Sequence, residues 1–479
     1  MDIKTAIFLI CNVVLTLGLG YYLISALQWY SYRIKRIIFH FHKPWWHFIF
    51  FIAPIVLYYA LKVYFVPILI LYLVSLYFWY QKLDKPLLFT KRVQRFFIFL
   101  IIILIFQNVI CLLYGLNFVV LVPLVSALFI SYIYEKIVFN GFRNEAVKKI
   151  KSIDNLKIIA ITASYGKTSI KNFLHHILEN NFKTYKTPKS VNTLGGLVLD
   201  VNNFLPHDTE LYIVEAGARE KGDIKEIADF LEPQITVVGQ IGAQHLEYFR
   251  TLENIRNTKM ELLSSKKLEI AFVHTSANAN PGNNEKVVLF GDDIVFIEES
   301  LDGIKFGIKI NEKTEEFETS ILGSFNAINL SVCIKIALYL GLSIETIRQK
   351  IKTIRSVEHR LQRIDAGGKI IIDDSFNGNF EGMKSSYNLA KKHNGEKVLV
   401  TPGIIESSDE ENAKLAEIMD DVFDLIIITG STNMEILDKS IKNTKKILLK
   451  DKSKLTEVLA KETKAGDLIL FSNDSPTYM

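Results

Sequence analysis

The chain has 479 residues, of which 49% are hydrophobic, and this length predicts two or three domains. Its net charge of +5 is uneven, because residues 1–150 contain 15 Lys and Arg against 4 Asp and Glu while the remainder is acidic. A basic excess confined to an apolar part indicates membrane topology and argues against nucleic-acid binding, and three cysteines (Cys11, Cys111 and Cys333) are too few for a disulfide framework or a cysteine metal cluster.

The first 150 residues predict about five membrane-spanning helices. Apolar runs occupy residues 5–29, 45–61, 64–80, 96–113 and 118–134, each near the roughly 20 residues that cross a bilayer. Basic segments at 33–36 and 82–95 should both face the cytoplasm, so an even number of crossings separates them. This favours two spans that turn near Lys62 over one long helix. The same count places the N-terminus outside and the chain after residue 136 in the cytoplasm.

The spans predict an anchor or a lipid-facing platform. No Asp, Glu, Lys or Arg lies in the core of a span, and ionisable residues inside the membrane are the usual mark of transport. Trp45, Trp46 and the tyrosines at the span ends are typical of interfacial belts. A transporter is therefore the less favoured interpretation.

A phosphate-binding loop is predicted at residues 163–169, which read Ala-Ser-Tyr-Gly-Lys-Thr-Ser. A β-branched run at 157–162 precedes the loop and a helical pattern at 170–178 follows it. In this order backbone N–H groups at the helix start point at phosphates, Lys167 neutralises charge, and the Thr168 hydroxyl can hold Mg²⁺. Ile161 occupies the position where the usual pattern G-x-x-x-x-G-K-[ST] has its first glycine.

The rest of the chain alternates strand and helix patterns, which predicts parallel sheets with crossover helices. Strands are predicted at 211–214 and 235–238, helices at 223–231, 252–263 and 326–340, and a β-rich acidic stretch at 271–319. A second α/β pattern begins at residue 369. We therefore predict domains at 1–150, 151–354 and 355–479.

Two further residues follow predicted strands, where parallel sheets present functional side chains. Glu215 comes directly after the run at 211–214 and is placed to hold Mg²⁺ beside the phosphate loop, although a strand-end carboxylate can also simply face solvent. His245 follows a strand and a glycine turn. A lone histidine is more often structural, so the residue alone predicts nothing.

At this point the residues resemble a known family, the Mur ligases, and most of all its MurF branch, which adds D-alanyl-D-alanine to a peptidoglycan precursor. The matching segments occur in order at residues 162–169, 187–196, 214–218, 241–247, 258–261, 323–329, 359–362 and 373–379. The resemblance covers roughly residues 155–410. It implies a phosphate-loop-containing central domain and a Rossmann-like α/β C-terminal domain after the membrane helices.

The resemblance also implies the site residues. ATP would contact Thr162, Ala163, Ser164, Tyr165, Gly166, Lys167, Thr168 and Ser169, with Asn326 and Asn329 near the adenine and Arg360, Asp374 and Asn377 reaching the nucleotide from the C-terminal domain. Two Mg²⁺ ions would be held by Thr168, Glu215, His245 and a carbamylated Lys259. Lys167, Lys259 and His245 would be catalytic.

The chain departs from the family pattern in several places. Ala163 replaces a glycine of the loop, Phe325 replaces the histidine before Asn326, and Phe380 replaces a proline after Asn379. The largest departure is that membrane spans occupy the place of the soluble domain that grips the UDP-sugar. Recognition of that substrate is therefore less supported than the ATP-dependent core.

The resulting hypothesis is an ATP-dependent amide ligase that adds D-alanyl-D-alanine to UDP-N-acetylmuramoyl-tripeptide through an acyl phosphate. Its partners would be that nucleotide-sugar peptide, a dipeptide, the lipid bilayer and cell-wall synthesis proteins, and its location the inner membrane of a bacterium with the catalytic domains in the cytoplasm. One alternative is a related ligase acting on a lipid-linked or other carboxylate. Another is a non-catalytic membrane assembly protein with a vestigial nucleotide domain.

Overall fold

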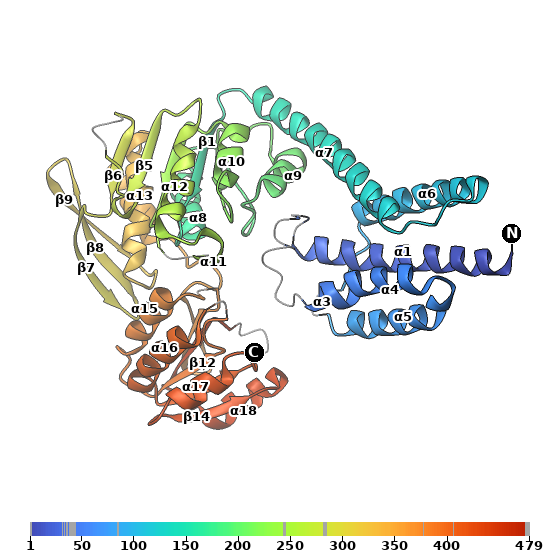
Figure 1. Ribbon diagram of the computed structural model, residues 1–479. Coiled ribbons are helices and arrows are strands. Elements are labelled where there is room, and N and C mark those ends of the chain that lie inside the picture. The colour runs from blue at the N-terminus through green and yellow to red at the C-terminus, as the bar shows by residue number, and fades with distance from the viewer. Residues whose placement is uncertain are drawn as a thin grey trace. The chain divides into compact units, whose positions relative to one another are not determined.

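The structure is a computed structural model that describes residues 2–30, 32, 34, 37, 45–83, 86–242, 246–280, 285–376, 378–405 and 407–474. Contacts divide the chain into two compact units, Met1–Phe142 and Arg143–Met479 (Figure 1). The described part of the first unit is helical, and every strand among the described residues lies in the second unit. Each unit is considered by itself below.

The first unit is built from long apolar helices. They are α1 (Ile3–Trp29), α3 (Trp45–His47), α4 (Ala53–Leu61), α5 (Val66–Gln81), α6 (Lys91–Tyr114) and the start of α7 (Leu121–Ser152), with a π-helical turn at Phe48–Ile52 and a 3-10 turn at Lys62–Phe65. Four helical runs, Ile3–Trp29, Trp45–Gln81, Lys91–Tyr114 and Leu121–Ser152, are long and apolar enough to cross a membrane. Helix α1 packs closely, because a Cβ on its Gly20 would lie 2.6 Å from the Leu100 side chain.

The run from Trp45 to Gln81 folds back on itself at Lys62, where the sequence predicts a turn. Lys62 has a positive φ of 48°. Beyond it the Tyr72 hydroxyl donates to the carbonyl of Phe50 at 3.3 Å, and the rings of Phe50 and Trp79 lie 5.5 Å apart. This run is therefore a helical hairpin and not one straight helix. The number of membrane crossings stays a prediction.

The second unit begins with a six-stranded parallel sheet in the order β2-β3-β1-β4-β5-β6. Its strands are β1 (Lys157–Thr162), β2 (Thr184–Lys186), β3 (Leu211–Glu215), β4 (Ile235–Val238), β5 (Ile270–His274) and β6 (Val287–Phe290). Helices α8 (Lys167–Leu178), α13 (Phe325–Tyr339) and α14 (Ile344–Lys352) bury one face in a common core. The remaining helices of this part are α9 (Leu194–Phe204), α10 (Asp223–Leu231), α11 (Leu246–Phe249) and α12 (Leu252–Met260), and Ile255 of α12 packs with Val238 and Val273 from the opposite face. The parallel sheet predicted from the alternating pattern is confirmed.

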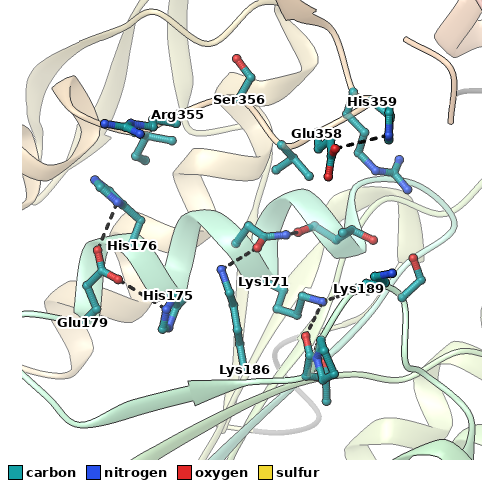
Figure 2. Close-up of a pocket in the computed structure, with 18 of the residues that line it drawn as sticks. Lys171, His175, His176, Glu179, Lys186, Lys189, Arg355, Ser356, Glu358 and His359 are labelled. Carbon is teal, nitrogen blue, oxygen red and sulfur yellow. Dashed lines mark hydrogen bonds and ion pairs between the residues drawn. The ribbon is translucent and has the colours of Figure 1, made fainter. Parts of the chain in front are cut away.

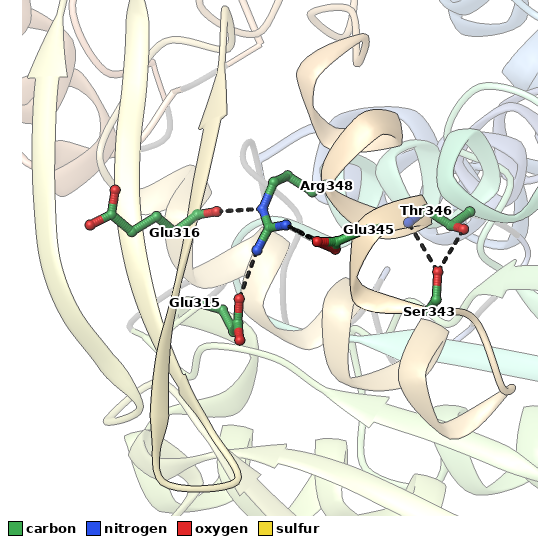
Figure 3. A network of polar contacts seen from close by, with 6 residues as sticks. All are labelled: Glu315, Glu316, Ser343, Glu345, Thr346 and Arg348. Carbon is green, nitrogen blue, oxygen red and sulfur yellow. Dashed lines mark hydrogen bonds and ion pairs between the residues drawn. The ribbon is translucent and has the colours of Figure 1, made fainter.

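The β-rich stretch predicted at 271–319 is divided between two sheets, because its first part supplies β5 and β6 of the parallel sheet. Its remainder forms a separate antiparallel sheet of β7 (Ile294–Ser300), β8 (Gly303–Ile310) and β9 (Lys313–Thr319). Arg348 of α14 ties this sheet to the helices (Figure 3). Its guanidinium contacts Glu315 on β9 at 2.7 Å and Glu345 one helical turn away at 2.8 Å, and it donates to the Glu316 carbonyl at 3.1 Å. Several charge-assisted bonds from one planar group fix the position of β9 against α14.

A second six-stranded sheet, in the order β10-β11-β15-β12-β13-β14, follows residue 361. Its strands are β10 (Gln362–Ala366), β11 (Lys369–Asp374), β12 (Lys397–Thr401), β13 (Leu425–Thr429), β14 (Lys445–Leu449) and β15 (Leu468–Ser472), and its helices are α15 (Phe380–Ala390), α16 (Asp409–Val422), α17 (Met434–Ser440) and α18 (Leu455–Glu462). Only β10 is antiparallel to its neighbour. Helices α15 to α17 share one core cluster and α18 packs into another, which is the doubly wound arrangement that the sequence predicts.

Candidate active site

The predicted phosphate loop joins β1 to α8 at the carboxyl edge of the first sheet. Gly166, directly before the helix, has a φ of 81°, a left-handed conformation that favours glycine. A Cβ at this position would also lie 2.4 Å from Oδ1 of Asn329 on α13. Conformation and space therefore both require glycine at residue 166, and the backbone N–H groups at the start of α8 are left open for an anion.

The loop is held in shape by the segment that follows β4. The backbone N–H of Ser164 donates to the Gln240 carbonyl at 2.8 Å, and its hydroxyl donates to the Gly242 carbonyl at 3.0 Å. Lys167 curls back over the loop and donates from Nζ to the Ala163 carbonyl at 2.6 Å. Burial lowers the pKa of Lys167 to about 8, so its ammonium lacks a full counter-charge.

Glu215 ends β3, paired in register with Ile161 of β1, and its side chain is 1% exposed. The Thr168 hydroxyl donates to Oε2 of Glu215 at 3.2 Å. Two oxygen groups from different elements thus meet directly below the phosphate loop. Oxygen groups are the ligands that Mg²⁺ prefers, so Thr168 and Glu215 would suit a magnesium ion, which would supply positive charge beside bound phosphates.

Lys171 is a site residue that the sequence reasoning missed. It is 1% exposed, and its Nζ lies 2.7 Å from Oε1 of Glu215. The same ammonium donates to the carbonyl of Thr187 at 2.8 Å and to that of Lys189. Lys171 therefore holds the Glu215 carboxylate with Oε2 turned toward Thr168. The available signal was a lysine one helical turn after Lys167 on a helix that the sequence places against the sheet.

Lys259, near the end of α12, is 4% exposed, and its side chain forms no hydrogen bond or ion pair within the described part of the chain. Burial and the neighbouring Lys167 hold the pKa of Lys259 well below its usual range. An uncharged primary amine is the form that adds carbon dioxide, so this environment fits a carbamylated lysine. His245, the other predicted ligand, lies outside the described residues, and those residues contain no group of three or more His, Cys, Asp and Glu suited to a metal.

Residues from the second sheet approach the same place. Arg360 lies close enough to Glu215 and Asp374 for both carboxylates to raise its pKa, although burial lowers that pKa more. Asp374, at the end of β11, is 1% exposed and accepts the Leu361 N–H at 3.2 Å. Arg360 and Asp374 are thus brought together with the phosphate-loop carboxylate. Asn377 lies outside the described residues.

The two asparagines of α13 form a short chain of hydrogen bonds beside the loop. Asn329 donates from Nδ2 to Oδ1 of Asn326 at 2.9 Å, and Asn326 donates to the Leu322 carbonyl at 2.8 Å. Both side chains are buried, and Asn329 stands against Gly166. The predicted adenine contacts therefore lie at the α13 side of α8.

A cavity of about 1350 Å³ opens on the other side of α8 and reaches Thr168 and Arg360 (Figure 2). We call it the basic cavity. It is lined by α8, by the segment from Thr184 to Ser190 and by the segment from Thr353 to Arg360, together with Phe376. The sequence reasoning did not predict it.

Comparisons with known proteins show which proteins these features resemble. A model of the Mur ligase middle domain matches residues 161–337. The UDP-N-acetylmuramoyl-tripeptide–D-alanyl-D-alanine ligase of Bacillus subtilis (strain 168) is 26% identical over 338 residues, which cover 66% of this chain and 72% of that protein. The ligase of the same name from Borreliella burgdorferi is 30% identical over 248 residues, which cover 49% of this chain and 52% of that protein, so the chain spans about half the length of that relative.

Solved structures agree on the fold. MurF from Acinetobacter baumannii superposes with a TM-score of 0.63 at 21% identity, covering 71% of this chain and 78% of that one. MurF from Thermotoga maritima in complex with ADP gives a TM-score of 0.61 at 24% identity, covering 71% of this chain and 81% of that one. At these identities the likeness shows the fold alone.

Proposed function

Residues 161–337 are a Mur ligase middle domain, and from this premise we propose that the chain is an ATP-dependent, ADP-forming amide ligase of the MurF type. It adds D-alanyl-D-alanine to UDP-N-acetylmuramoyl-tripeptide, the reaction named for its relatives in Bacillus subtilis and Borreliella burgdorferi. The observation that carries the proposal is the meeting of Thr168 and Glu215, 3.2 Å apart, directly below a phosphate loop that ends in Lys167.

In this reaction an acceptor carboxylate attacks the γ-phosphorus of ATP and ADP leaves, which gives an acyl phosphate. The dipeptide amine then attacks the acyl carbon, loses a proton and displaces inorganic phosphate. Both steps place negative charge on oxygen atoms. Magnesium, held by Thr168, Glu215 and a carbamylated Lys259, would neutralise that charge when bound.

The residues of the chain perform the remaining work. Lys167 binds the transferred phosphate when it leaves the Ala163 carbonyl, and N–H groups at the start of α8 orient the phosphate chain. Arg360 brings a positive charge from the second sheet toward the same oxygens. We assign the site residues His245 and Asn377 by resemblance only, with His245 at the second metal and Asn377 at the nucleotide.

We further propose the division of the chain into a membrane part at 1–150, a central ATP-binding domain at 151–354 and a C-terminal domain at 355–479. The four apolar helical runs support an anchor in the cytoplasmic membrane of a bacterium, with the ligase domains in the cytoplasm. A second candidate function keeps the chemistry and replaces the acceptor by a lipid-linked carboxylate, and the same helices favour it.

A product assay tests the proposal. Full-length protein in detergent, supplied with ATP, Mg²⁺, UDP-N-acetylmuramoyl-tripeptide and D-alanyl-D-alanine, should form the pentapeptide product and ADP in equal amounts. Lys167→Ala should abolish both. ADP formation without amide product would refute this acceptor or amine, and an unchanged rate in Lys167→Ala would refute the catalytic assignment of the loop.

A further inference from the structure

The side chains that line the basic cavity carry a net positive charge. Five Lys and Arg line it, Lys171, Lys186, Lys189, Arg355 and Arg360, against the two carboxylates of Glu179 and Glu358. Glu179 contacts His175 and His176 at 3.4 and 3.3 Å and also raises the pKa of Lys186, so it offsets part of this positive charge. The Glu358 side chain is 81% exposed and faces His359 at 3.6 Å.

Apart from Lys171, these cations form no ion pair with a carboxylate among the described residues. Glu179 acts on Lys186, and Glu215 and Asp374 act on Arg360, only through space. Lys186, at the end of β2, donates only to the amide oxygen of Asn172, at 2.7 Å. Lys189 and Arg355 are exposed and form no side-chain hydrogen bond or ion pair in the described part of the chain. Figure 2 shows Lys186 and Lys189 coming from the β2 side and Arg355 from the segment before β10.

The pKa shifts in the cavity agree with a positive field that Glu179 compensates only in part. Burial and then Lys171 lower the pKa of Lys186. Burial and then Lys186 lower the pKa of His175 to about 4, so this imidazole is neutral at pH 7. These positive charges therefore repel one another, and a bound anionic ligand would reduce that repulsion.

The backbone also fixes one of these cations in an unfavourable conformation. Lys189 has a φ of 46°, in the left-handed region that a lysine seldom adopts. Its carbonyl is held there by Lys171. Residues kept in such conformations by their surroundings gather at ligand sites, so the observation directs attention to the cavity.

The cavity does not coincide with the predicted adenine contacts. Asn326 and Asn329 do not line the cavity. Helix α13 packs on the face of α8 that carries Ile170, where the Cys333 thiol donates to the Ile170 carbonyl at 3.6 Å. The cavity faces Asn172, which lies about 200° further around the helix. A nucleotide held by the phosphate loop and Asn329 leaves the cavity free, while Thr168 at its mouth connects the two.

We propose that the basic cavity binds the diphosphate of the nucleotide-sugar acceptor, with Lys186, Lys189 and Arg355 as its cationic contacts. This inference rests on the proposed function, because the acceptor's UDP group supplies the diphosphate. A volume of about 1350 Å³ exceeds the roughly 300–1,000 Å³ of most small-molecule sites and suits an extended, polar ligand.

Binding of UDP tests the site directly. Full-length protein in detergent is saturated with Mg²⁺ and a non-hydrolysable ATP analogue, so that the phosphate loop is occupied, and UDP is titrated by calorimetry. We expect one UDP per chain, displaced by inorganic pyrophosphate, with affinity at least tenfold lower in Lys186→Met and in Arg355→Met. Lys183→Met and Lys352→Met, which remove exposed charges outside the cavity, should bind UDP like the wild type.

Absence of UDP binding, or equal binding in Lys186→Met and Arg355→Met, overturns the proposal, as does an equal loss in the two control variants. In the ligation assay the two cavity variants should raise KM for the acceptor tenfold or more and leave KM for ATP within twofold. A rise in KM for ATP instead would identify the cavity as part of the ATP site. If no ligation occurs but UDP binds as expected, the proposed ligase reaction is refuted and the proposed diphosphate site is supported.

Discussion

Replacing Lys171 by methionine tests the most buried charge contact of the site. The side chains of Lys171 and Glu215 are each 1% exposed and lie 2.7 Å apart. Methionine keeps most of the volume and removes the ammonium. Glu215 would then be a buried carboxylate without its counter-charge, and the carbonyls of Thr187 and Lys189 would lose their donor.

The expected cost follows from these contacts. Breaking a buried ion pair by removing one partner costs about 3–5 kcal/mol, and each orphaned carbonyl adds about 1 kcal/mol or more. Because domains are stable by only about 5–15 kcal/mol, Lys171→Met should bring the second unit close to unfolding. Glu215→Gln should cost less. In the double variant the two costs should not add, because neither charge remains, and we expect a coupling of about 3 kcal/mol.

The assay must report on the second unit alone. All four tryptophans lie between residues 29 and 79, so their fluorescence follows the first unit. Pulse proteolysis of the full-length protein in urea, read as the surviving fragment after residue 143, gives the required free energy of unfolding. Lys183→Met, at an exposed pair with Asp208, is the control and should change that free energy by less than about 1 kcal/mol. Additive costs of Lys171→Met and Glu215→Gln would show that the pair does not interact.

Three further outcomes are expected. Gly166→Ala should weaken ADP binding at least tenfold by calorimetry, since its Cβ would collide with Asn329 at a φ of 81°, and unchanged binding would contradict the loop geometry. Lys259→Met should abolish ligation. In buffer without magnesium or bicarbonate, where Lys259 carries a free amine, the same change should raise the melting temperature because it removes a poorly solvated amine, and a lower melting temperature would contradict that reasoning. Burial raises the pKa of Asp420, but backbone N–H groups of residues 442–444 hold it down to about 2, so the carboxylate stabilises the fold above its unfolded pKa near 3.8. The difference in melting temperature between wild type and Asp420→Asn should therefore be full at pH 6 and vanish between pH 4 and pH 2, and a difference that persists at pH 2 would exclude this cause.

Local patterns predicted the elements that carry the site. The β-branched run before residue 163 and the helical pattern after it define the phosphate loop, and the strand that ends at Glu215 places its carboxylate at the same sheet edge. Charge alone predicted the turn at Lys62, because two basic segments required an even number of crossings. These features depend on residues near one another in the chain, or on the opposing environments of membrane and water.

Contacts between distant residues were beyond that reasoning. Lys171 and Glu215 are 44 positions apart, and Asn329 meets Gly166 only because α13 packs on α8. The edge strand β10 was also missed, since Gln362–Ala366 has only Ile364 and a terminal alanine as hydrophobic residues and gains its strand conformation by pairing with β11. The roles of His245 and Asn377 stay predictions.

The shared ammonium of Lys171 has a consequence for the order in which ligands bind. It touches the carboxylate that faces Thr168 and also the carbonyl of Lys189, whose side chain lines the basic cavity. A ligand that moves the segment Thr187–Lys189 would therefore also move the Glu215 carboxylate. A metal bound by Glu215 would in turn affect the position of that segment. Thermodynamic linkage makes such an effect reciprocal. If an acceptor in the cavity raises the affinity for nucleotide and magnesium, then nucleotide and magnesium raise the affinity for the acceptor by the same factor. Such coupling would favour ATP cleavage only when the carboxylate to be activated is already bound.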